Sequence, residues 1–491
     1  MDPAVFTRRR HRTKQLLQPI LRAYALGYLS STTPKVVSCL RRLWKSNDLS
    51  HQQKVAEFLQ ALSSALRLES FPTFCASLVG CSTLLPLLVL KAVQAACRRL
   101  GTDPRFLSSK EASRLVQFVT AFISAWSSFQ ILNRKPVALQ NVLRESQAEA
   151  SRGAVGSQAA VGLNSHSQTQ FAGRTMDLTL FTVTRALDSL VCIFWAWGQK
   201  QRKVNSRWAA ADSIAPRLAD SAVFASSAAV VMWAWFYLPE RLPRSYEKWI
   251  GEVAKVDNRL VEALRRARRS IFVYGKDTGQ APLLQSMCKD YAWPTDWGDP
   301  AKTIPIPCEM VHMGCGPSCE KHAISRFLRT FKFACATYIP LQIVFRFRSM
   351  NSVASFRRAV SDALRSSSFL ASFVSIFYYS VCLSRTRLGP RIFAKGTVTP
   401  QMWDSGLCVG AGCVMCGWSI LVEHAKKRQE IALFVAPRAA ATVLPRFYDK
   451  KYQYRERAAF AISAAVLFTC FRECPDMVRG VFGRIGKSIV N

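Results

Sequence analysis

The chain has 491 residues, and its 67 Lys and Arg against 31 Asp and Glu give a formal net charge of +36 at pH 7. Hydrophobic residues make up 49% of it, which excludes a chain that is disordered throughout. The sign of the charge excludes an acidic mimic of nucleic acid. Two classes remain: a nucleic-acid binder, or a membrane protein whose loops carry the basic residues.

The distribution of charge decides between these classes. Charged residues make up 20% of the chain, yet five stretches of at least 18 residues contain none. These stretches are Phe71–Leu90, Leu115–Asn133, Ser221–Pro239, Ser366–Ser384 and Ser405–Val422. Each has roughly the 20 residues that a helix needs to cross a hydrocarbon core about 30 Å thick. We therefore predict an all-α fold, that of a polytopic helical membrane protein.

In chain order, residues 1–69 form an amphipathic, basic N-terminal region. Residues 140–175 are rich in Ser, Gln, Gly and Ala, which predicts a flexible loop. Residues 240–330 form a basic linker with a Cys/His-rich segment. We expect about nine hydrophobic helices, near 71–94, 115–132, 178–198, 221–238, 331–347, 367–384, 405–423, 430–447 and 458–472.

The second half of the chain repeats the first. Three blocks align in the same order: SFPTFCASLV (70–79) with SSSFLASFVS (366–375), DLTLFTVTRA (177–186) with EIALFVAPRA (430–439), and SAVFASSAAVV (221–231) with RAAFAISAAVL (457–467). We therefore predict two related repeats of transmembrane helices, 70–239 and 331–491, on either side of the linker. Internal duplication is typical of membrane bundles, including transporters.

The repeat places Arg185 and Arg438 at matching positions inside apolar helices. A charge there is costly, so we expect each arginine to pair with a carboxylate or to donate to backbone carbonyls of a neighbouring helix, and we favour an ion pair inside the bundle. Asp188 is the local candidate for Arg185, and Glu423 or Glu430 for Arg438. A substrate-binding charge is the alternative interpretation.

Cys308, His312, Cys315 and Cys319 have the spacing C-x3-H-x2-C-x3-C. Four N and S ligands so close together could enclose one tetrahedral Zn²⁺ ion, if the intervening glycines fold the loop tightly. A packed Cys/His turn without metal is the interpretation we favour, and redox or disulfide use is a third. We expect no cofactor, and a structural zinc ion at these four residues is the alternative.

Two further patterns concern packing and lipid. Four glycines in one span, Gly406, Gly410, Gly412 and Gly417, predict close helix approach, because a residue without Cβ lets backbones meet in lipid. The basic stretch Arg259–Lys276 lacks the aromatic interleaving of a nucleic-acid module. We expect it to attract anionic lipid headgroups, at roughly 1 kcal/mol per basic residue near the surface.

Several of these segments together resemble the transmembrane protein 135 family. They are CEMVHMGCGPSC (308–319) before the helix FKFACATYIPLQIVFR (331–346), SSSFLASFVSIFYYSVCLSR (366–385) and EIALFVAPRA (430–439). The family is distantly related to the channel superfamily of the mitochondrial inner-membrane translocases. The resemblance, to a divergent fungal-type member, implies a multi-pass protein of peroxisomal or mitochondrial membranes that acts in organelle dynamics and lipid homeostasis. The Cys-rich segment lies mid-chain here, whereas animal members carry it near the N-terminus.

The sequence contains no Walker loop, no G-x-S-x-G and no H-E-x-x-H motif. We therefore expect a non-enzymatic integral membrane protein, peroxisomal before mitochondrial, that acts in membrane organisation or lipid-linked metabolism. A carrier or channel for a small metabolite or lipid between the two repeats is the alternative. Its expected partners are the bilayer with its anionic headgroups, and a second copy or other organelle membrane proteins, but not nucleic acid.

Overall fold

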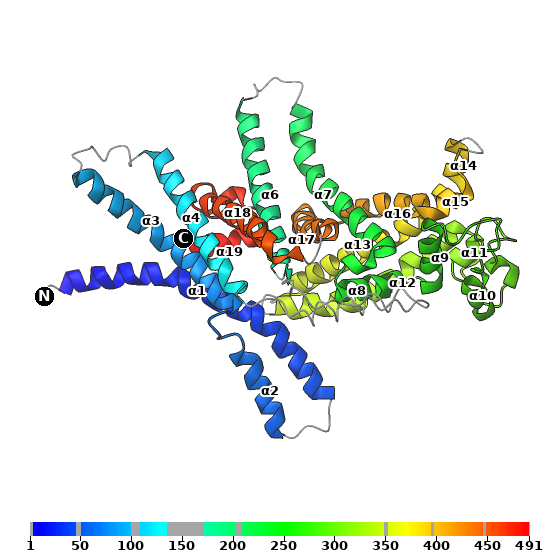
Figure 1. Cartoon of the computed structure of the whole chain (residues 1–491), viewed down its shortest axis with the longest axis horizontal. Helices are drawn as coiled ribbons and strands as arrows, with labels where there is room; N and C mark the ends of the chain where they lie inside the picture. Colours follow the sequence, from blue (N-terminus) through cyan, green and yellow to red (C-terminus); the bar gives the residue numbers. More distant parts are fainter. Residues whose placement is uncertain are drawn as a thin grey trace. The chain divides into compact units, whose positions relative to one another are not determined.

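The computed structural model describes residues 3–45, 51–99, 109–134, 171–173, 175–201, 209–347, 352–393, 397–444 and 448–490. These residues are mainly helical (Figure 1), which confirms the predicted all-α class. The strands among them are β1 (Phe171–Ala172) and β2 (Tyr448–Asp449), which pair antiparallel. Most of the predicted flexible loop, residues 140–170, lies outside the described residues.

Six helical segments of the described chain are long and apolar enough to cross a membrane. They are α3 (Phe71–Arg99), α4 (Lys110–Leu132), α6 (Met176–Gln201), the part Asp212–Tyr237 of α7 (Ala209–Tyr237), Val353–Ile392, and Pro400–Val422. Val353–Ile392 contains α13 (Val353–Leu383), η5 (Ser384–Leu388) and α14 (Gly389–Ile392), and Pro400–Val422 contains α15 (Pro400–Met402), η6 (Trp403–Leu407), α16 (Cys408–Cys416) and η7 (Gly417–Val422). Three of the five charge-free stretches fall within these segments, and Leu115–Asn133 and Ser221–Pro239 extend one or two residues beyond them. The segments indicate a multi-pass membrane protein.

The other three predicted hydrophobic helices do form, but they are not among the six. They are α12 (Cys319–Arg346), α17 (Ala425–Val443) and α18 (Gln453–Glu473). Charged residues lie within or beside their apolar stretches: the first turn of α17 contains Lys426, Lys427 and Arg428, and α18 ends with Arg472 and Glu473. Their mean hydropathy is therefore lower, and the estimate of about nine spans was too high for the described residues.

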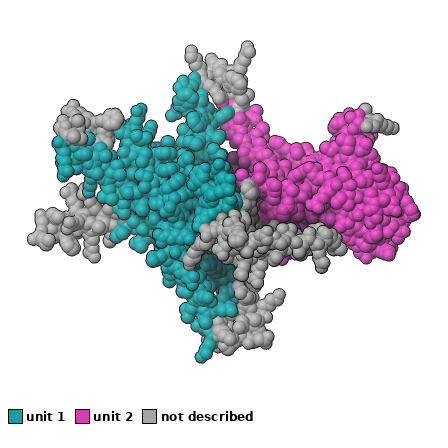
Figure 2. Space-filling model, viewed as in Figure 1, with its two compact units in different colours: residues 1–206, 446–491 teal, residues 207–445 magenta. Residues whose placement is uncertain are grey.

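The chain divides into two compact units (Figure 2). Unit 1 comprises Met1–Ser206 and Arg446–Asn491, and unit 2 comprises Arg207–Pro445. The segments 70–239, 240–330 and 331–491 do not coincide with these units, because α7 belongs to unit 2 and α18 to unit 1. Each of these two helices buries its apolar side chains in the unit that it joins.

In unit 1, α18 packs against α4 and α6, and α3 packs against α4 and α1 (Pro3–Lys45). The rings of Phe74, Phe129 and Phe460 meet in its core, with centroids 5.0 to 5.8 Å apart. The N-terminal region 1–69 contributes α1 and α2 (His51–Ser63), and the chain ends in η9 (Pro475–Met477) and α19 (Gly480–Val490). The short helix η8 (Lys450–Tyr452) leads from β2 into α18.

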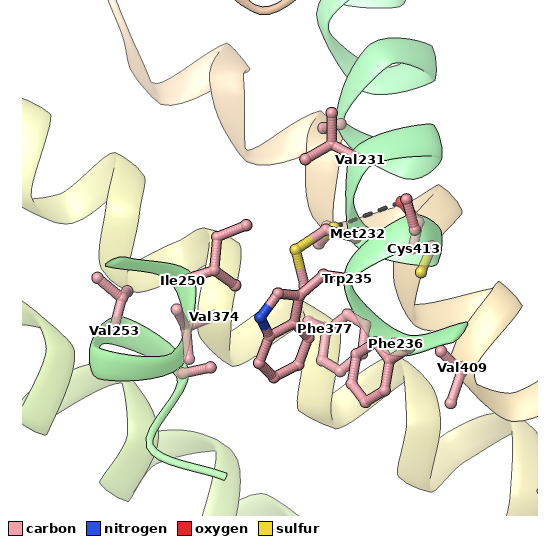
Figure 3. Close-up of a cluster of buried hydrophobic side chains, with 14 of the residues drawn as sticks. Val231, Met232, Trp235, Phe236, Ile250, Val253, Val374, Phe377, Val409 and Cys413 are labelled. Atoms are coloured by element: carbon pink, nitrogen blue, oxygen red, sulfur yellow. Dashed lines mark hydrogen bonds between the residues drawn. The ribbon is translucent and has the colours of Figure 1, made fainter. Parts of the chain in front are cut away.

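In unit 2, α7 packs against α16 and α17, and α13 packs against α12 and α16. The segment predicted as a linker is folded here, into η2 (Pro239–Arg241), α8 (Arg244–Ala254), α9 (Asn258–Arg268), α10 (Ala281–Asp290), η3 (Thr295–Gly298) and α11 (Cys308–Val311). It has a core of its own, in which Phe272, Leu284, Met287 and Met310 are fully buried. A larger core joins α7, α8, α13, α16 and α17 (Figure 3).

Candidate functional site

Unit 2 encloses an apolar cavity of about 530 Å³ between α7, α8, α12, α13 and α17. Small-molecule sites in proteins measure roughly 300–1,000 Å³, so the cavity has room for a ligand. The helical repeat creates its walls. Val231 and Trp235 of α7, Ile250 and Val253 of α8, and Val374 and Phe377 of α13 are spaced three or four residues apart and line it (Figure 3).

Two polar side-chain atoms of the cavity walls have hydrogen-bond partners within the protein. The Trp235 indole Nε1 donates to the carbonyl oxygen of Glu247, at 3.4 Å. The Tyr378 hydroxyl donates to the carbonyl oxygen of Ala254, at 3.0 Å. Because these groups are satisfied within the protein, the lining offers a ligand mostly apolar surface.

At the rim of the cavity the surroundings become polar. Trp249 and Phe434 line the cavity and remain 44% and 52% exposed. The guanidinium of Arg438 lies over the Phe434 ring, 3.8 Å from its centroid, and donates to the carbonyl oxygen of Phe434. The pKa of Tyr246, another lining residue, is raised above its ordinary value because the phenol is buried, and the nearby charge of Arg438 offsets part of this rise. The rim therefore carries the positive charge of Arg438 beside an apolar interior. Burial and, second to it, the nearby charge of Glu423 raise the pKa of Tyr338, another lining residue.

A second feature of unit 2 is a buried cluster of His312, Cys319 and Cys382, whose potential ligand atoms lie within 4.8 Å of one another. His312 follows α11, Cys319 is the first residue of α12, and Cys382 lies near the end of α13. The Nε2 of His312 is 3.3 Å from the Sγ of Cys382. Among the described residues, these three are the ones whose His, Cys, Asp or Glu ligand atoms lie close enough together to hold a metal ion.

The cluster differs from the set of four predicted ligands. Cys315 Sγ donates instead to the hydroxyl of Ser325, at 3.6 Å, and is not one of the three. Cys308 is close enough to Cys319 for their charges to interact, and burial raises the pKa of Cys308. Cys382 was missed because it lies in an apolar helix, where a cysteine has the same pattern as any small hydrophobic residue.

Aromatic rings and arginines surround this cluster. The His312 and His322 rings are stacked 4.6 Å apart, and His322 meets the edge of Tyr378. Burial lowers the pKa of His322 to about 3, so this imidazole is neutral at physiological pH. Arg326 donates to the carbonyl oxygens of Ala254 and Lys255, which holds α12 against the end of α8.

A buried ion pair lies near the cluster and was not foreseen. Arg385 of η5 contacts Asp404 of η6 twice, Nε to Oδ1 and Nη2 to Oδ2, each at 2.8 Å. Their side chains are only 6% and 2% exposed. The Tyr274 hydroxyl also donates to Asp404. The pair joins the ends of the two helical segments Val353–Ile392 and Pro400–Val422.

Two of the intramembrane charges singled out in the sequence, Arg185 and Asp188, belong to α6 of unit 1. In unit 1, Arg185 is buried, with the rings of Phe181 and Phe482 at 5.3 and 5.6 Å from its guanidinium. Asp188 accepts hydrogen bonds from Arg479, a residue that the prediction did not include.

In unit 2, Glu423 is 1% exposed, and one of its carboxylate oxygens lies 3.8 Å from the Nζ of Lys427. The contacts of Arg438 are those with Phe434 at the cavity rim. Arg438 therefore lies beside a residue of the cavity wall.

The four glycines differ in how closely they are packed. A Cβ on Gly417 would lie 2.5 Å from the Cα of Ala225 in α7, and one on Gly412 would lie 2.8 Å from the Phe377 ring in α13. Gly406 has a φ of +149° and would place a Cβ 3.0 Å from Arg268. A Cβ on Gly410 would meet only the Trp233 ring, at an ordinary 3.6 Å. Gly412 and Gly417 therefore permit the close approach of helices.

The basic stretch 259–276 makes many contacts within unit 2. Arg259 binds Asp257 and Asp290, and Arg266 binds Glu262. Two other arginines of the stretch contact α7. Arg265 donates to the carbonyl oxygens of Trp235 and Phe236. The guanidinium of Arg268 lies over the rings of Trp233 and Tyr237. Fewer of its charges than the sequence suggested are left for lipid headgroups.

No family model, curated protein or solved structure matches this chain. The features that bear on its function are therefore its own: the membrane-length helices, the apolar cavity with Arg438 at its rim, and the cluster of His312, Cys319 and Cys382.

Proposed function

We propose that the chain is a non-enzymatic, multi-pass protein of an organelle membrane that binds the acyl chain of an anionic lipid in the cavity of unit 2. The cavity carries this proposal, because about 530 Å³ of space lies among apolar side chains and opens beside a positive charge. Binding of an acyl chain is the form of lipid-linked metabolism that this geometry supports best.

An acyl chain fits the chemistry of the cavity walls. Its methylene groups need no hydrogen-bond partners, and the polar atoms of Trp235 and Tyr378 have theirs within the protein. Each buried methylene contributes about 0.8 kcal/mol, so a long chain gains enough for stable binding. Two of the walls, α7 and α13, belong to segments of membrane length, and lipid is the solvent that such helices meet.

The rim supports an anionic rather than a neutral headgroup. The Arg438 guanidinium lies over Phe434, which is itself half-exposed and lines the cavity. A planar guanidinium with five donors suits a carboxylate or a phosphate. A fatty acid and an acidic phospholipid share this chemistry, and the assay below distinguishes them by mass.

We also infer that the two halves of the chain are copies of one unit that have exchanged a helix. In unit 1, α3 packs on α4, and α18 packs on α4 and α6. In unit 2, α13 packs on α16, and α7 packs on α16 and α17. The aligned blocks relate α3 to α13, α6 to α17 and α18 to α7, so the same neighbours recur if α4 corresponds to α16. Arg185 over Phe181 and Arg438 over Phe434 repeat one contact.

The organelle is proposed from the resemblance of residues 308–346 and 366–385 to the transmembrane protein 135 family. The peroxisome is the organelle we favour, and the mitochondrion is the alternative. A carrier for a lipid is the second candidate function, and the proposed duplication favours it. Fractionation of cells that express the tagged full chain tests the location, and a signal confined to the plasma membrane would contradict it.

The binding proposal is tested by counting the lipid that stays with the purified chain. Ala228 lines the cavity and Ala222 lies on the exposed face of the same helix, so Ala228→Phe and Ala222→Phe form a matched pair. Excluding two methylene groups at about 0.8 kcal/mol each weakens binding by about tenfold. We expect Ala228→Phe, but not Ala222→Phe, to lose the lipid that mass spectrometry detects in the wild-type chain.

A second variant tests the headgroup. Arg438→Gln removes about 1 kcal/mol of attraction, so the preference for anionic over zwitterionic lipid falls about fivefold while total binding of acyl chains persists. Equal lipid retention by the wild type, Ala228→Phe and Ala222→Phe would refute binding in the cavity. An unchanged headgroup preference in Arg438→Gln would refute the role of Arg438 in binding the headgroup, but not the binding of the acyl chain in the cavity.

A further inference from the structure

We propose that His312, Cys319 and Cys382 bind a zinc ion that joins α12 to α13. These three side chains are buried, and their ligand atoms lie within 4.8 Å of one another. The proposal is independent of lipid binding, because none of the three lines the cavity. It also replaces the contiguous set of four ligands with one that the fold assembles from separate elements.

The orientation of His312 is the first argument for a metal. Its Nδ1 lies 2.7 Å from the carbonyl oxygen of Gly316. A carbonyl oxygen can only accept, so Nδ1 carries the proton and donates, and the lone pair of Nε2 points toward Cys382. Histidine ligands of metals are held in this way, with the second ring nitrogen donating to a backbone carbonyl or a carboxylate.

The spacing of the donor atoms is the second argument. Zinc lies about 2.3 Å from a cysteine sulfur and about 2.0–2.1 Å from a histidine nitrogen, so a tetrahedral site separates the two donors by roughly 3.5 Å. The observed distance from His312 Nε2 to Cys382 Sγ is 3.3 Å. Small side-chain rotations would therefore suffice to bring the donors around one ion.

The charges of the site also suit zinc. On binding, the thiols of Cys319 and Cys382 each release a proton to solvent, and two thiolates balance one Zn²⁺ ion. Cys319 is the first residue of α12, where the backbone N–H groups of a long helix favour negative charge. Soft sulfur ligands with one imidazole select zinc over calcium or magnesium.

The fourth position of the ion is open to water or to Cys308. Cys308 lies near enough to Cys319 for their charges to interact, but it is not among the three residues whose donors converge. A Cys308→Ser variant distinguishes the two: it lowers zinc affinity if the thiol binds and leaves it unchanged if water does.

The test measures zinc in the purified full chain, expressed in zinc-supplemented medium, by elemental analysis. We expect about one zinc ion per chain in the wild type and in Cys315→Ser, because Cys315 faces Ser325. Cys382→Ser, which changes a single atom, should lose it. The contiguous set of ligands predicts the reverse, with zinc lost in Cys315→Ser and kept in Cys382→Ser.

A second readout needs no substitution. A thiol reagent is applied to the native chain, and the chain is then unfolded and digested. Peptide mass spectrometry reports which cysteines reacted in the native state. We expect Cys319 and Cys382 to react more slowly in the zinc-loaded chain than in the same chain after a chelator has removed the zinc, because a thiolate bound to the ion is not available to the reagent. A wild-type chain without zinc, or a Cys319–Cys382 disulfide in chain purified under reducing conditions, would overturn the proposal.

Discussion

Replacing Gly417 by alanine tests the contact between the glycine-rich segment and α7. The added Cβ would lie 2.5 Å from the Cα of Ala225 and 3.0 Å from its Cβ and its carbonyl oxygen. Two of these three atoms belong to the backbone of a buried helix, so no side-chain rotation relieves the overlap. Overpacking of a core costs about 1–3 kcal/mol, and the rigid neighbour places Gly417→Ala near the upper end, at about 3 kcal/mol.

Alanine also forms helix better than glycine, by about 1 kcal/mol. The net loss of unfolding free energy is therefore about 2 kcal/mol, which corresponds to a fall in Tm of roughly 4–8 °C for a unit of this size. Gly410→Ala is the matched control, because its Cβ would meet only the Trp233 ring at 3.6 Å. It should be neutral or stabilising by up to about 1 kcal/mol.

The assay is thermal unfolding of the purified full chain in one detergent, followed by circular dichroism. We expect Gly417→Ala to unfold at a lower temperature than the wild type, and Gly410→Ala at the same or a higher one. If Gly417→Ala were as stable as Gly410→Ala, α7 and the segment at Gly417 would not approach each other this closely, and the packing of unit 2 would be wrong.

Three further predictions concern unit 2. Asp404→Asn leaves the Arg385 charge buried without its partner, so it should cost about 3–5 kcal/mol in chemical unfolding; a loss below about 1 kcal/mol would refute the buried pair. The hydrogen bonds of Arg259 hold the pKa of the Asp257 carboxyl below its usual value, so the stability that this carboxylate contributes is present above the ordinary aspartate pKa of about 4 and lost as the pH falls below it. The stability gap between the wild type and Asp257→Asn should therefore close on acidification, and a gap that widens would contradict this sign. Because 207–445 forms a compact unit, that fragment should unfold cooperatively when expressed alone, whereas 331–491 should not; the opposite result would refute the helix exchange.

The membrane-length helices were predictable because their signal is local. A charge-free run such as Phe71–Leu90 needs no knowledge of its neighbours, and each of the five runs became such a helix. Helices such as α17 and α18 were overestimated as spans, because apolar centres were given more weight than the charges at their ends.

The candidate sites depend on contacts between distant parts of the chain, and these were only partly predictable. His312 and Cys319 were chosen correctly as neighbours, but Cys382 enters the cluster only through the packing of α13 beside α12. Arg385 and Asp404 belong to different helical segments, and neither position signals its partner. The cavity itself needs five helices, so no single segment indicates it.

Photolabelling from the acyl chain of a lipid tests the central proposal most directly. Ile250 and Val253 line the cavity, are each 7% exposed, and belong to α8, which is not among the membrane-length helices of the described chain. With the full chain in bilayers that contain a phospholipid with a diazirine on its acyl chain, we expect label at these two residues, and less of it in Ala228→Phe. Label at exposed positions such as Leu88 and Val191, with none at Ile250 or Val253, would contradict acyl-chain binding in the cavity.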